Sequence, residues 1–159
     1  MTMSPDRVEA VVEVFRRPGL LYVVDAFVLH PNDTKILMQK RAPNLRLFPN
    51  FWDPTGGFLK SGESVFLGLK RAISEEIGAS LSQVHQMVHS FDWKDGEHSV
   101  RNLQFLVDVQ NVEFRLDAPK VLAHKWFGWD DLDRESNCLT AQMREGLGKA
   151  LQQAELLRR

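Results

Sequence analysis

The chain has 159 residues, of which 43% are hydrophobic and 26% are charged, and its formal net charge is −1 at pH 7. These values are ordinary for a globular chain, so we expect one domain spanning residues 1–159. The near-neutral charge argues against nucleic acid or an anionic membrane as a partner. A single cysteine, Cys138, excludes a disulfide within the chain. The chain also has no apolar signal segment at its start and no apolar stretch long enough to span a membrane. Together with the single cysteine, these features favour a cytoplasmic protein.

The first third of the chain predicts strands separated by turns. Residues 8–15 and 20–29 are rich in β-branched and aromatic residues, and Pro18-Gly19 divides them, so we expect two strands. A turn at residues 31–33 precedes a returning strand over residues 35–41. The next segment, residues 42–54, contains three prolines and two asparagines, which predicts a surface loop.

A helix is expected after the glycine pair Gly56-Gly57. Ser64 can cap its first turn with the side-chain hydroxyl, and Gly78 can end it after Ile77 by adopting a left-handed conformation. Because Glu75 lies within about 40° of Arg71 on a helical wheel, the arginine could hold that carboxylate in a bidentate pair.

The second half of the chain predicts a hairpin, a further strand and a final helix. Asp95-Gly96 is a turn signal between apolar runs at residues 84–93 and 100–109. A strand is expected over residues 123–129, and the spacing of apolar residues over 139–157 predicts a helix. Strands and helices recur throughout the chain, which indicates an α/β fold with a sheet layered between helices.

Two adjacent carboxylates on the first of these helices suggest a metal site. Glu76 lies at the edge of the apolar face, directly after Glu75, and Ala72 precedes Glu76 by one turn. Neighbouring carboxylates repel each other, and a bound Mg²⁺ would offset that repulsion. The alternative is a solvated helix face that carries two acids by chance.

The spacing of these residues resembles a known motif. It is similar to the Nudix box, G-x5-E-x7-R-E-U-x-E-E-x-G-U, where U is a bulky apolar residue. The matching residues are Gly57, then Glu63 after five residues, Arg71 after seven more, and Ile73, Glu75-Glu76 and Gly78. The flanking stretches ILMQKR, FPNFWDPTGG and HKWFGWDDL also resemble members of that family. The resemblance covers roughly residues 20 to 155. It implies a Nudix-type α/β/α sandwich with a mixed sheet, on which the box helix and a C-terminal helix pack.

The resemblance also implies a function. Family members hydrolyse a diphosphate linkage in a nucleoside diphosphate derivative with Mg²⁺ or Mn²⁺, and many of them are homodimers. By resemblance, Glu75 and Glu76 would be catalytic and would bind the metal, together with the Gly56 carbonyl oxygen. The remaining box residues, which would orient the site, are Gly57, Glu63, Arg71 and Gly78. Arg41, at the end of the strand before the loop, would meet substrate phosphate.

One departure from the motif bears on the chemistry. Ala72 stands where the family has the first glutamate of R-E-U-x-E-E, an acid that commonly binds metal or activates water. The replacement base is expected from the predicted hairpin, where Asp92, Asp95 and Glu97 are the candidates and Glu97 is included in the catalytic set. The change at Ala79, a smaller residue than usual, is of little consequence.

Three functions remain open on the sequence alone. The first is an active hydrolase, and the second is a non-catalytic module that binds a nucleotide or a protein partner, which Ala72 favours. The third is the isomerase branch of the same fold, which relies on a cysteine upstream of the box, whereas Cys138 lies far downstream. Packing in the core or at its rim is the expected role of the tryptophans at positions 52, 93, 126 and 129.

Overall fold

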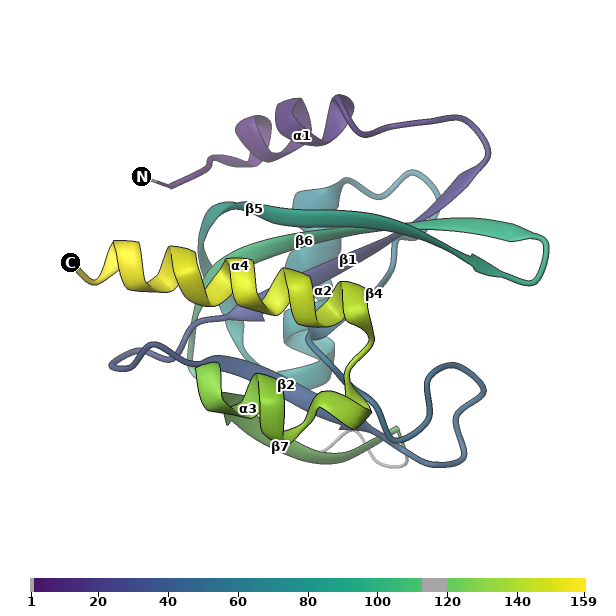
Figure 1. Cartoon of the computed structure of the whole chain (residues 1–159). Helices are drawn as coiled ribbons and strands as arrows, with labels where there is room; N and C mark the ends of the chain where they lie inside the picture. Colours follow the sequence, from purple (N-terminus) through teal and green to yellow (C-terminus); the bar gives the residue numbers. More distant parts are fainter. Residues whose placement is uncertain (1, 113–119) are drawn as a thin grey trace.

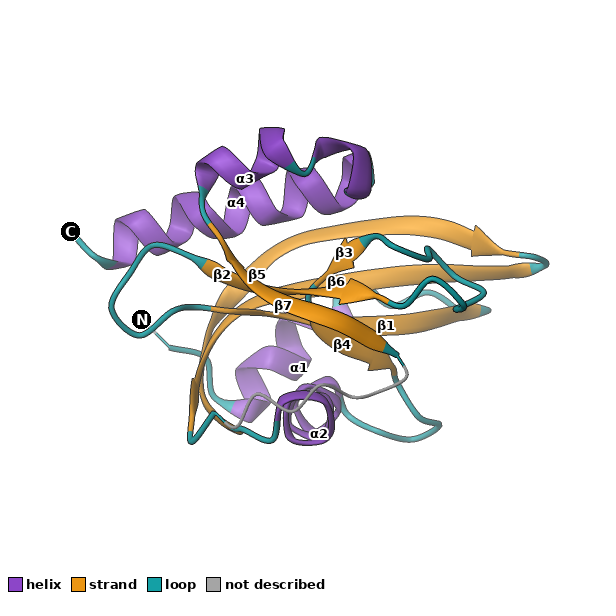
Figure 2. Cartoon of the chain, turned by 90° about the horizontal axis from the view of Figure 1, so that it is seen from below, coloured by secondary structure: helices purple, strands orange, loops and turns teal. Residues whose placement is uncertain are grey.

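The computed structural model, which describes residues 2–112 and 120–159, has helices on both sides of its strands (Figures 1 and 2). The arrangement confirms the predicted α/β/α fold. The helices are α1 (Pro5–Glu13) and α2 (Val65–Ile77) on one side, and α3 (Trp129–Arg134), a short 3-10 turn (Ser136–Cys138) and α4 (Ala141–Leu157) on the other.

The strands form two sheets. One has the order β4-β1-β6-β5 and the other β3-β2-β7. The first sheet is mixed, because β1 runs parallel to β6 while its other neighbour, β4, is antiparallel. The strands are β1 (Leu20–Val28), β2 (Ile36–Arg41), β3 (Trp52–Asp53), β4 (Thr55–Phe58), β5 (Ser80–Asp95), β6 (His98–Gln110) and β7 (Val121–Phe127).

The predicted strand over residues 8–15 is wrong, because most of this segment belongs to helix α1. Ser4 caps the helix by accepting a hydrogen bond from the Arg7 N–H, and Pro5 occupies the first turn, where its missing N–H has no cost. Val8 and Val12, one turn apart, are fully buried, whereas Val14 is exposed. The burial therefore follows a helical period, and packing outweighs the β-propensity of the valines.

Helix α2 begins and ends where the sequence predicts. The Ser64 hydroxyl accepts from the Leu67 N–H, and Gly78 adopts a left-handed φ of 63° at the C-terminus. A second acceptor at the N-terminus comes from α1, where Glu9 accepts a hydrogen bond from the Phe66 N–H. This contact ties α1 to the start of the box helix.

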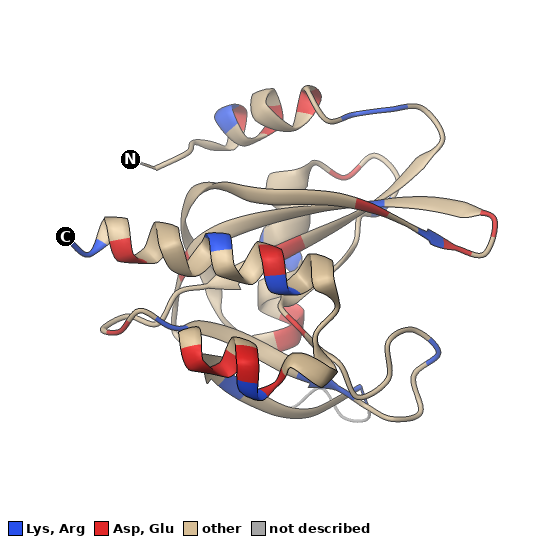
Figure 3. Ribbon diagram, viewed as in Figure 1, with Lys and Arg blue, Asp and Glu red and all other residues tan. Residues whose placement is uncertain are grey.

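Strand β1 separates two apolar cores. Val24 and Ala26 belong to the core beneath α1 and α2, whereas Phe27 belongs to the core beneath α4. Because side chains alternate along a strand, Asp25 shares the α4 side with Phe27. Acidic and basic residues are interspersed over the helices and loops (Figure 3). No helix in the described part of the chain combines the length and the apolar character needed to cross a membrane.

Candidate active site

A cavity of about 440 Å³ opens where the box meets the loop over residues 42–51 and the β5–β6 hairpin. It brings together Arg71, Glu75 and Glu76 of α2 with the glycine pair of β4. Its remaining walls come from β1, β2, β3 and β6, from the start of β7 and from the start of α4. A cavity of this size is typical of small-molecule sites, so it defines the candidate active site.

Arg71 holds the box together through Glu63. Its Nε donates to Glu63 Oε2 at 2.7 Å and its Nη2 donates to Glu63 Oε1 at 2.9 Å. The same guanidinium reaches the Phe58 carbonyl oxygen at 3.1 Å and Glu75 Oε2 at 3.3 Å. The predicted bidentate pair with Glu75 is therefore wrong. Glu63 has that role because the loop before α2 brings it alongside Arg71, and Glu75 is left with a single weak bond.

The Arg71–Glu63 pair predicts a pH-dependent contribution to stability. The hydrogen bonds from Arg71 lower the pKa of Glu63 from 4.5 to about 2. A carboxylate with a lowered folded-state pKa stabilises the fold above its unfolded pKa and loses that contribution as the pH falls towards the folded value. We expect Glu63→Gln to reduce the free energy of unfolding by about 1–2 kcal/mol near neutral pH. The difference should shrink steadily below the unfolded pKa of 4.5.

Urea unfolding of both proteins across this acidic range measures the effect. Glu13→Gln is the matched control, because Glu13 forms an exposed pair with Arg16 at 3.3 Å and surface pairs contribute little. A Glu63→Gln deficit that stays constant with pH would contradict the assigned role of the ion pair.

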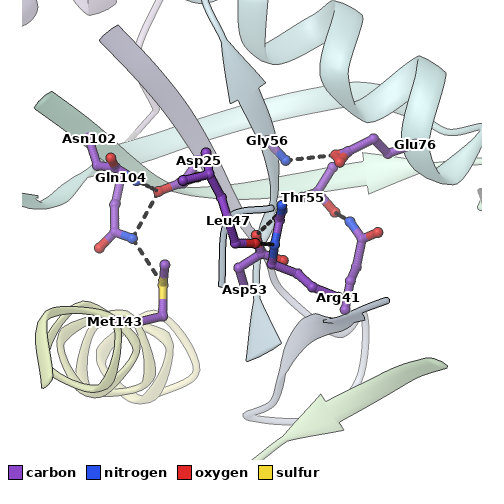
Figure 4. Close-up of polar contacts among 11 residues, drawn as sticks. Asp25, Arg41, Leu47, Asp53, Thr55, Gly56, Glu76, Asn102, Gln104 and Met143 are labelled. Carbon is purple, nitrogen blue, oxygen red and sulfur yellow. Dashed lines mark hydrogen bonds and ion pairs between the residues drawn. The ribbon is translucent and has the colours of Figure 1, made fainter. Parts of the chain in front are cut away.

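Glu76 connects α2 to β4 at the cavity. Its Oε2 accepts a hydrogen bond from the Gly56 N–H at 2.8 Å (Figure 4). Glu75 also lines the cavity, and its side chain is 60% exposed. The sequence-predicted ligands Glu75, Glu76 and Gly56 therefore meet at one place.

These residues fit a divalent metal that keeps part of its water shell. Within residues 2–112 and 120–159, no group of three His, Cys, Asp or Glu side chains is close enough to hold a metal ion. Two carboxylates and a backbone carbonyl remain as donors. Mg²⁺ is commonly bound by one or two carboxylates together with waters and substrate phosphates, so the oxygen donors present suit that ion.

The two glycines of the pair, Gly56 and Gly57, differ in how much space surrounds them. A Cβ on Gly56 would overlap the Val24 carbonyl oxygen and lie 2.7 Å from Asp25 Oδ1, whereas a Cβ on Gly57 would meet nothing within 4 Å. Close approach of β1 thus demands glycine at position 56. Position 57 carries no comparable restriction, because nothing lies within 4 Å of the Cβ that a larger residue would add there.

We expect Gly56→Ala to destabilise the fold by about 1–3 kcal/mol, because the strands must separate to admit the methyl group. Gly57→Ala is the matched control and should change the free energy of unfolding by less than about 0.5 kcal/mol. Chemical denaturation of the two variants tests the contrast. Equal effects would show that the close approach of β1 to β4 does not limit the substitution.

Ala72 is buried, with 2% of its surface exposed, and is absent from the cavity lining. The helix turns this position towards the protein interior, one turn before Glu76. Where the box has its first acid, this chain has a small side chain that fits between α2 and its neighbours. The cavity therefore receives two carboxylates from the helix, Glu75 and Glu76.

The hairpin acids do not reach the cavity. Asp92 points to the opposite face from Phe91 and Trp93 and accepts two hydrogen bonds from Arg101, at 2.6 and 2.8 Å. Asp95 is held by Arg46, and Glu97 is exposed in the turn between β5 and β6. None of the three acids lines the cavity, so the structure does not bring Glu97 next to Glu75 and Glu76.

Sequence reasoning missed two acids that do line the cavity, Asp25 and Asp53. Asp25 is only 4% exposed, and its Oδ2 accepts from Asn102 Nδ2 at 2.7 Å and Gln104 Nε2 at 3.0 Å (Figure 4). Burial raises the pKa of Asp25 to about 6. Burial also raises the pKa of Asp53 to about 7, with Arg41 opposing the shift and Asp25 adding to it. The signal in the sequence was the lone acid within the apolar run LLYVVDAFVL.

Arg41 lines the cavity and is engaged by the protein itself. Its Nη1 donates to Asp53 Oδ2 at 3.2 Å and its Nε donates to the Leu47 carbonyl oxygen at 2.9 Å (Figure 4). The arginine thereby anchors the loop over residues 42–51 to β3. Any contact with a substrate phosphate would have to share this guanidinium with Asp53.

The loop over residues 42–51 is also joined to the hairpin across the cavity. Arg46 donates to both carboxylate oxygens of Asp95, at 2.7 and 2.9 Å. Next to this pair, Phe48 packs edge-on against Trp93 with 5.4 Å between ring centroids. Phe48 has a positive φ of 48°, which is uncommon for a bulky residue. Aromatic walls therefore flank the cavity on the loop side and the hairpin side.

A mixed sheet between helices, with the helix after β4 delivering carboxylates to an open cavity, is the architecture of the Nudix fold. The chain belongs to the NUDIX domain family, whose model matches residues 20–152. Solved structures agree with this assignment. The MutT NUDIX hydrolase from Burkholderia pseudomallei is 25% identical and has a TM-score of 0.68, covering 81% of this chain and 96% of that one.

Other relatives extend the comparison. The NUDIX domain of Shewanella oneidensis NrtR, crystallised with ADP ribose, shares the fold at 18% identity and a TM-score of 0.66, covering 91% of this chain and 97% of that chain. Among curated proteins, the m7GpppN-mRNA hydrolase NUDT17 of Xenopus laevis is 34% identical over 59 residues, or 37% of this chain and 20% of the relative. The Danio rerio protein is 39% identical over 57 residues, or 36% and 19%. These alignments span about a fifth of the relatives' length.

Proposed function

We propose that this protein is a metal-dependent pyrophosphohydrolase that cleaves the diphosphate linkage of a nucleoside diphosphate derivative. The observation that carries the proposal is the meeting of Glu75, Glu76 and Gly56 at a cavity large enough for a nucleotide. The reaction is attack of water on a phosphorus atom, with a phosphate group as leaving group. A bound Mg²⁺ or Mn²⁺ would neutralise charge on the phosphate oxygens and lower the pKa of the attacking water.

The residues of the chain have distinct roles in this reaction. Glu76, whose carboxylate is held by the Gly56 N–H, would bind the metal, and the Gly56 carbonyl oxygen would be its backbone ligand. Glu75 is exposed at the cavity and bonded only weakly to Arg71, and it would bind metal-held water or take its proton. Arg71 and Glu63 keep α2 in register with β4.

Turnover of a panel of nucleoside diphosphate derivatives tests the proposal. Each compound is incubated with Mg²⁺, with Mn²⁺ or with EDTA, and the released nucleoside monophosphate is quantified. We expect metal-dependent release from at least one compound and none in EDTA. Release that persists in EDTA, or no release from any compound with either metal, would count against a metal-dependent hydrolase.

Ala72 supports a second candidate, a module that binds a nucleotide without hydrolysing it. The missing carboxylate would leave metal binding weaker while the cavity stays intact. This function predicts that nucleotides raise the thermal stability of the protein although none is consumed. The lone cysteine supports a cytoplasmic location for either function.

A further inference from the structure

The loop over residues 42–51 forms part of the cavity wall and is fastened at its base by Arg41. The Arg41 N–H donates to the Phe51 carbonyl oxygen at 2.9 Å, and the Asn50 N–H donates to the Arg41 carbonyl oxygen at 3.0 Å. The side chain adds a bond from Nε to the Leu47 carbonyl oxygen at 2.9 Å. The two ends of the loop are therefore held together where β2 ends and β3 begins, and a movement of its tip about this base would change the width of the cavity mouth.

Two side-chain contacts hold the tip of this loop to the β5–β6 hairpin. Arg46 donates to both carboxylate oxygens of Asp95, at 2.7 and 2.9 Å. Beside this pair, Phe48 packs edge-on against Trp93, and both of these aromatic side chains line the cavity. Because Arg46 and Asp95 are 49 residues apart in the chain, the ion pair closes the space between two separate segments.

The contacts at the tip are of a kind that breaks while a domain stays folded. The Arg46 side chain is 72% exposed and that of Asp95 is 20% exposed, and ion pairs near the surface contribute little and are screened by salt. Phe48 is 40% exposed and has a positive φ, which is uncommon for a bulky residue. Opening the tip therefore costs less than separating the strands beneath it, where Ile36 and Leu37 of β2 are fully buried.

We propose that the loop over residues 42–51 is a gate to the cavity and that the Arg46–Asp95 ion pair is its latch. With the latch formed, Phe48 lies against Trp93 and the cavity mouth is narrow. When the ion pair breaks, the tip turns away about its base at Arg41, and a ligand enters or leaves. The inference goes beyond the proposed function, because the gate acts on any ligand of this cavity, whether or not that ligand is hydrolysed.

Native-state proteolysis of the whole chain with chymotrypsin measures the opening without a ligand. The protease cleaves after aromatic residues, and Phe48 and Phe51 lie within the gate. Cleavage follows the population of the open form when opening and closing are fast. Asp95→Asn breaks the latch and leaves the sequence of the gate unchanged. We expect cleavage after these two residues, located by mass spectrometry, to become about 3-fold faster, with an unchanged urea midpoint of unfolding.

A matched variant and salt separate the latch from a general loss of charge. Asp133→Asn removes an exposed pair of the same two residue types, with Arg144 at 2.6 Å, and should leave cleavage of the gate unchanged. Raising NaCl to about 1 M should accelerate that cleavage in the unaltered protein and in Asp133→Asn, because the ion pair at the tip is screened. The acceleration should be absent in Asp95→Asn, which has no ion pair left to screen.

Acrylamide, a small molecule that quenches tryptophan fluorescence on contact, tests whether the opening exposes the cavity. The share of the fluorescence that comes from Trp93 is the difference between each protein and its Trp93→Phe counterpart. We expect acrylamide to quench this share more strongly in Asp95→Asn than in the unaltered protein. Faster cleavage with unchanged quenching would mean that the loop moves without opening the cavity, which overturns the gate.

The outcomes separate this inference from the proposed function. Equal cleavage of the unaltered protein and Asp95→Asn overturns the gate. So does an acceleration that Asp133→Asn shares, or one that accompanies a lowered urea midpoint. Faster cleavage and stronger quenching in Asp95→Asn alone support the gate, even if no nucleoside diphosphate derivative is hydrolysed. Metal-dependent hydrolysis can equally be observed in a protein whose gate has been disproved.

Discussion

Replacing Glu76 by glutamine is expected to lower kcat for metal-dependent hydrolysis by about 100-fold or more, in the range typical for removal of a charged catalytic group. The substitution removes the negative charge that would hold the metal. It keeps an acceptor for the Gly56 N–H, which lies 2.8 Å from Glu76 Oε2 in the structure. The fold should therefore change little, and the loss should appear in kcat and in the metal concentration needed for half-maximal rate.

Steady-state rates across a range of Mg²⁺ concentrations measure this effect, with unfolding curves to check stability. Glu145→Gln is the control, because Glu145 is an exposed residue of α4 with a loose ion pair to Lys149 at 3.4 Å. Unchanged turnover of Glu76→Gln at saturating Mg²⁺ would remove Glu76 from the metal site. A large loss of stability would instead assign it a structural role through Gly56.

The box helix could be predicted residue by residue because its signals are local. The start depends on the Ser64 hydroxyl three residues before Leu67, and the end depends on the left-handed backbone of Gly78. Both are short-range contacts that follow from residue type. Helix α1 shows the opposite case. Its valines favour a strand by propensity, and the helix becomes evident only when Val8 and Val12 are seen to pack beneath the sheet.

The inner cavity could not be predicted because it depends on strand register. Asp25 meets Asn102, which follows it by 77 residues, only because β1 and β6 run parallel and adjacent. One residue of slip would turn Asn102 and Gln104 to the other face of the sheet. The sequence shows that Asp25 is an unusual acid in an apolar run, but the neighbouring residues do not indicate which side chains donate to it.

The candidates for the replacement base do not reach the cavity, again because their positions depend on the geometry of the strands. Asp92, Asp95 and Glu97 are close in sequence to Trp93, which does line the cavity. Alternation along β5 sends Asp92 to the other face, and the turn carries Glu97 into solvent. Asp95 lies on the same face of β5 as Trp93, but Arg46 binds both of its carboxylate oxygens. A motif defines the residues of the box helix, whereas residues on the other walls depend on pairing between strands.

The departure at Ala72 gives a test of whether the family's first carboxylate can be restored. Ala72→Glu adds a carboxylate one turn before Glu76, and alanine and glutamate are both good helix formers. The limit is space, because position 72 is 2% exposed. Forcing a larger side chain into a packed site costs about 1–3 kcal/mol. We therefore expect a lower melting temperature without metal.

If the new carboxylate reaches the cavity beside Glu76, it supplies a metal ligand or a base. A positioned base contributes about 10²–10⁴-fold to a rate, and after imperfect placement we expect a gain of about 10-fold or more over a slow starting rate. Mg²⁺ should also restore part of the lost stability, since metal binding stabilises the folded state. Hydrolysis rates and melting curves across Mg²⁺ concentrations measure both effects.

Ala72→Gln separates charge from bulk in this experiment, because it has the same length and no carboxylate. It should lose stability as Ala72→Glu does, gain no activity and show no added response to Mg²⁺. A fast starting enzyme, with Ala72→Glu equal or slower, would mean that the cavity already has its base, and Glu75 is then the side chain placed to provide it. Equal gains from glutamate and glutamine would assign the effect to a shift of α2 rather than to a restored ligand.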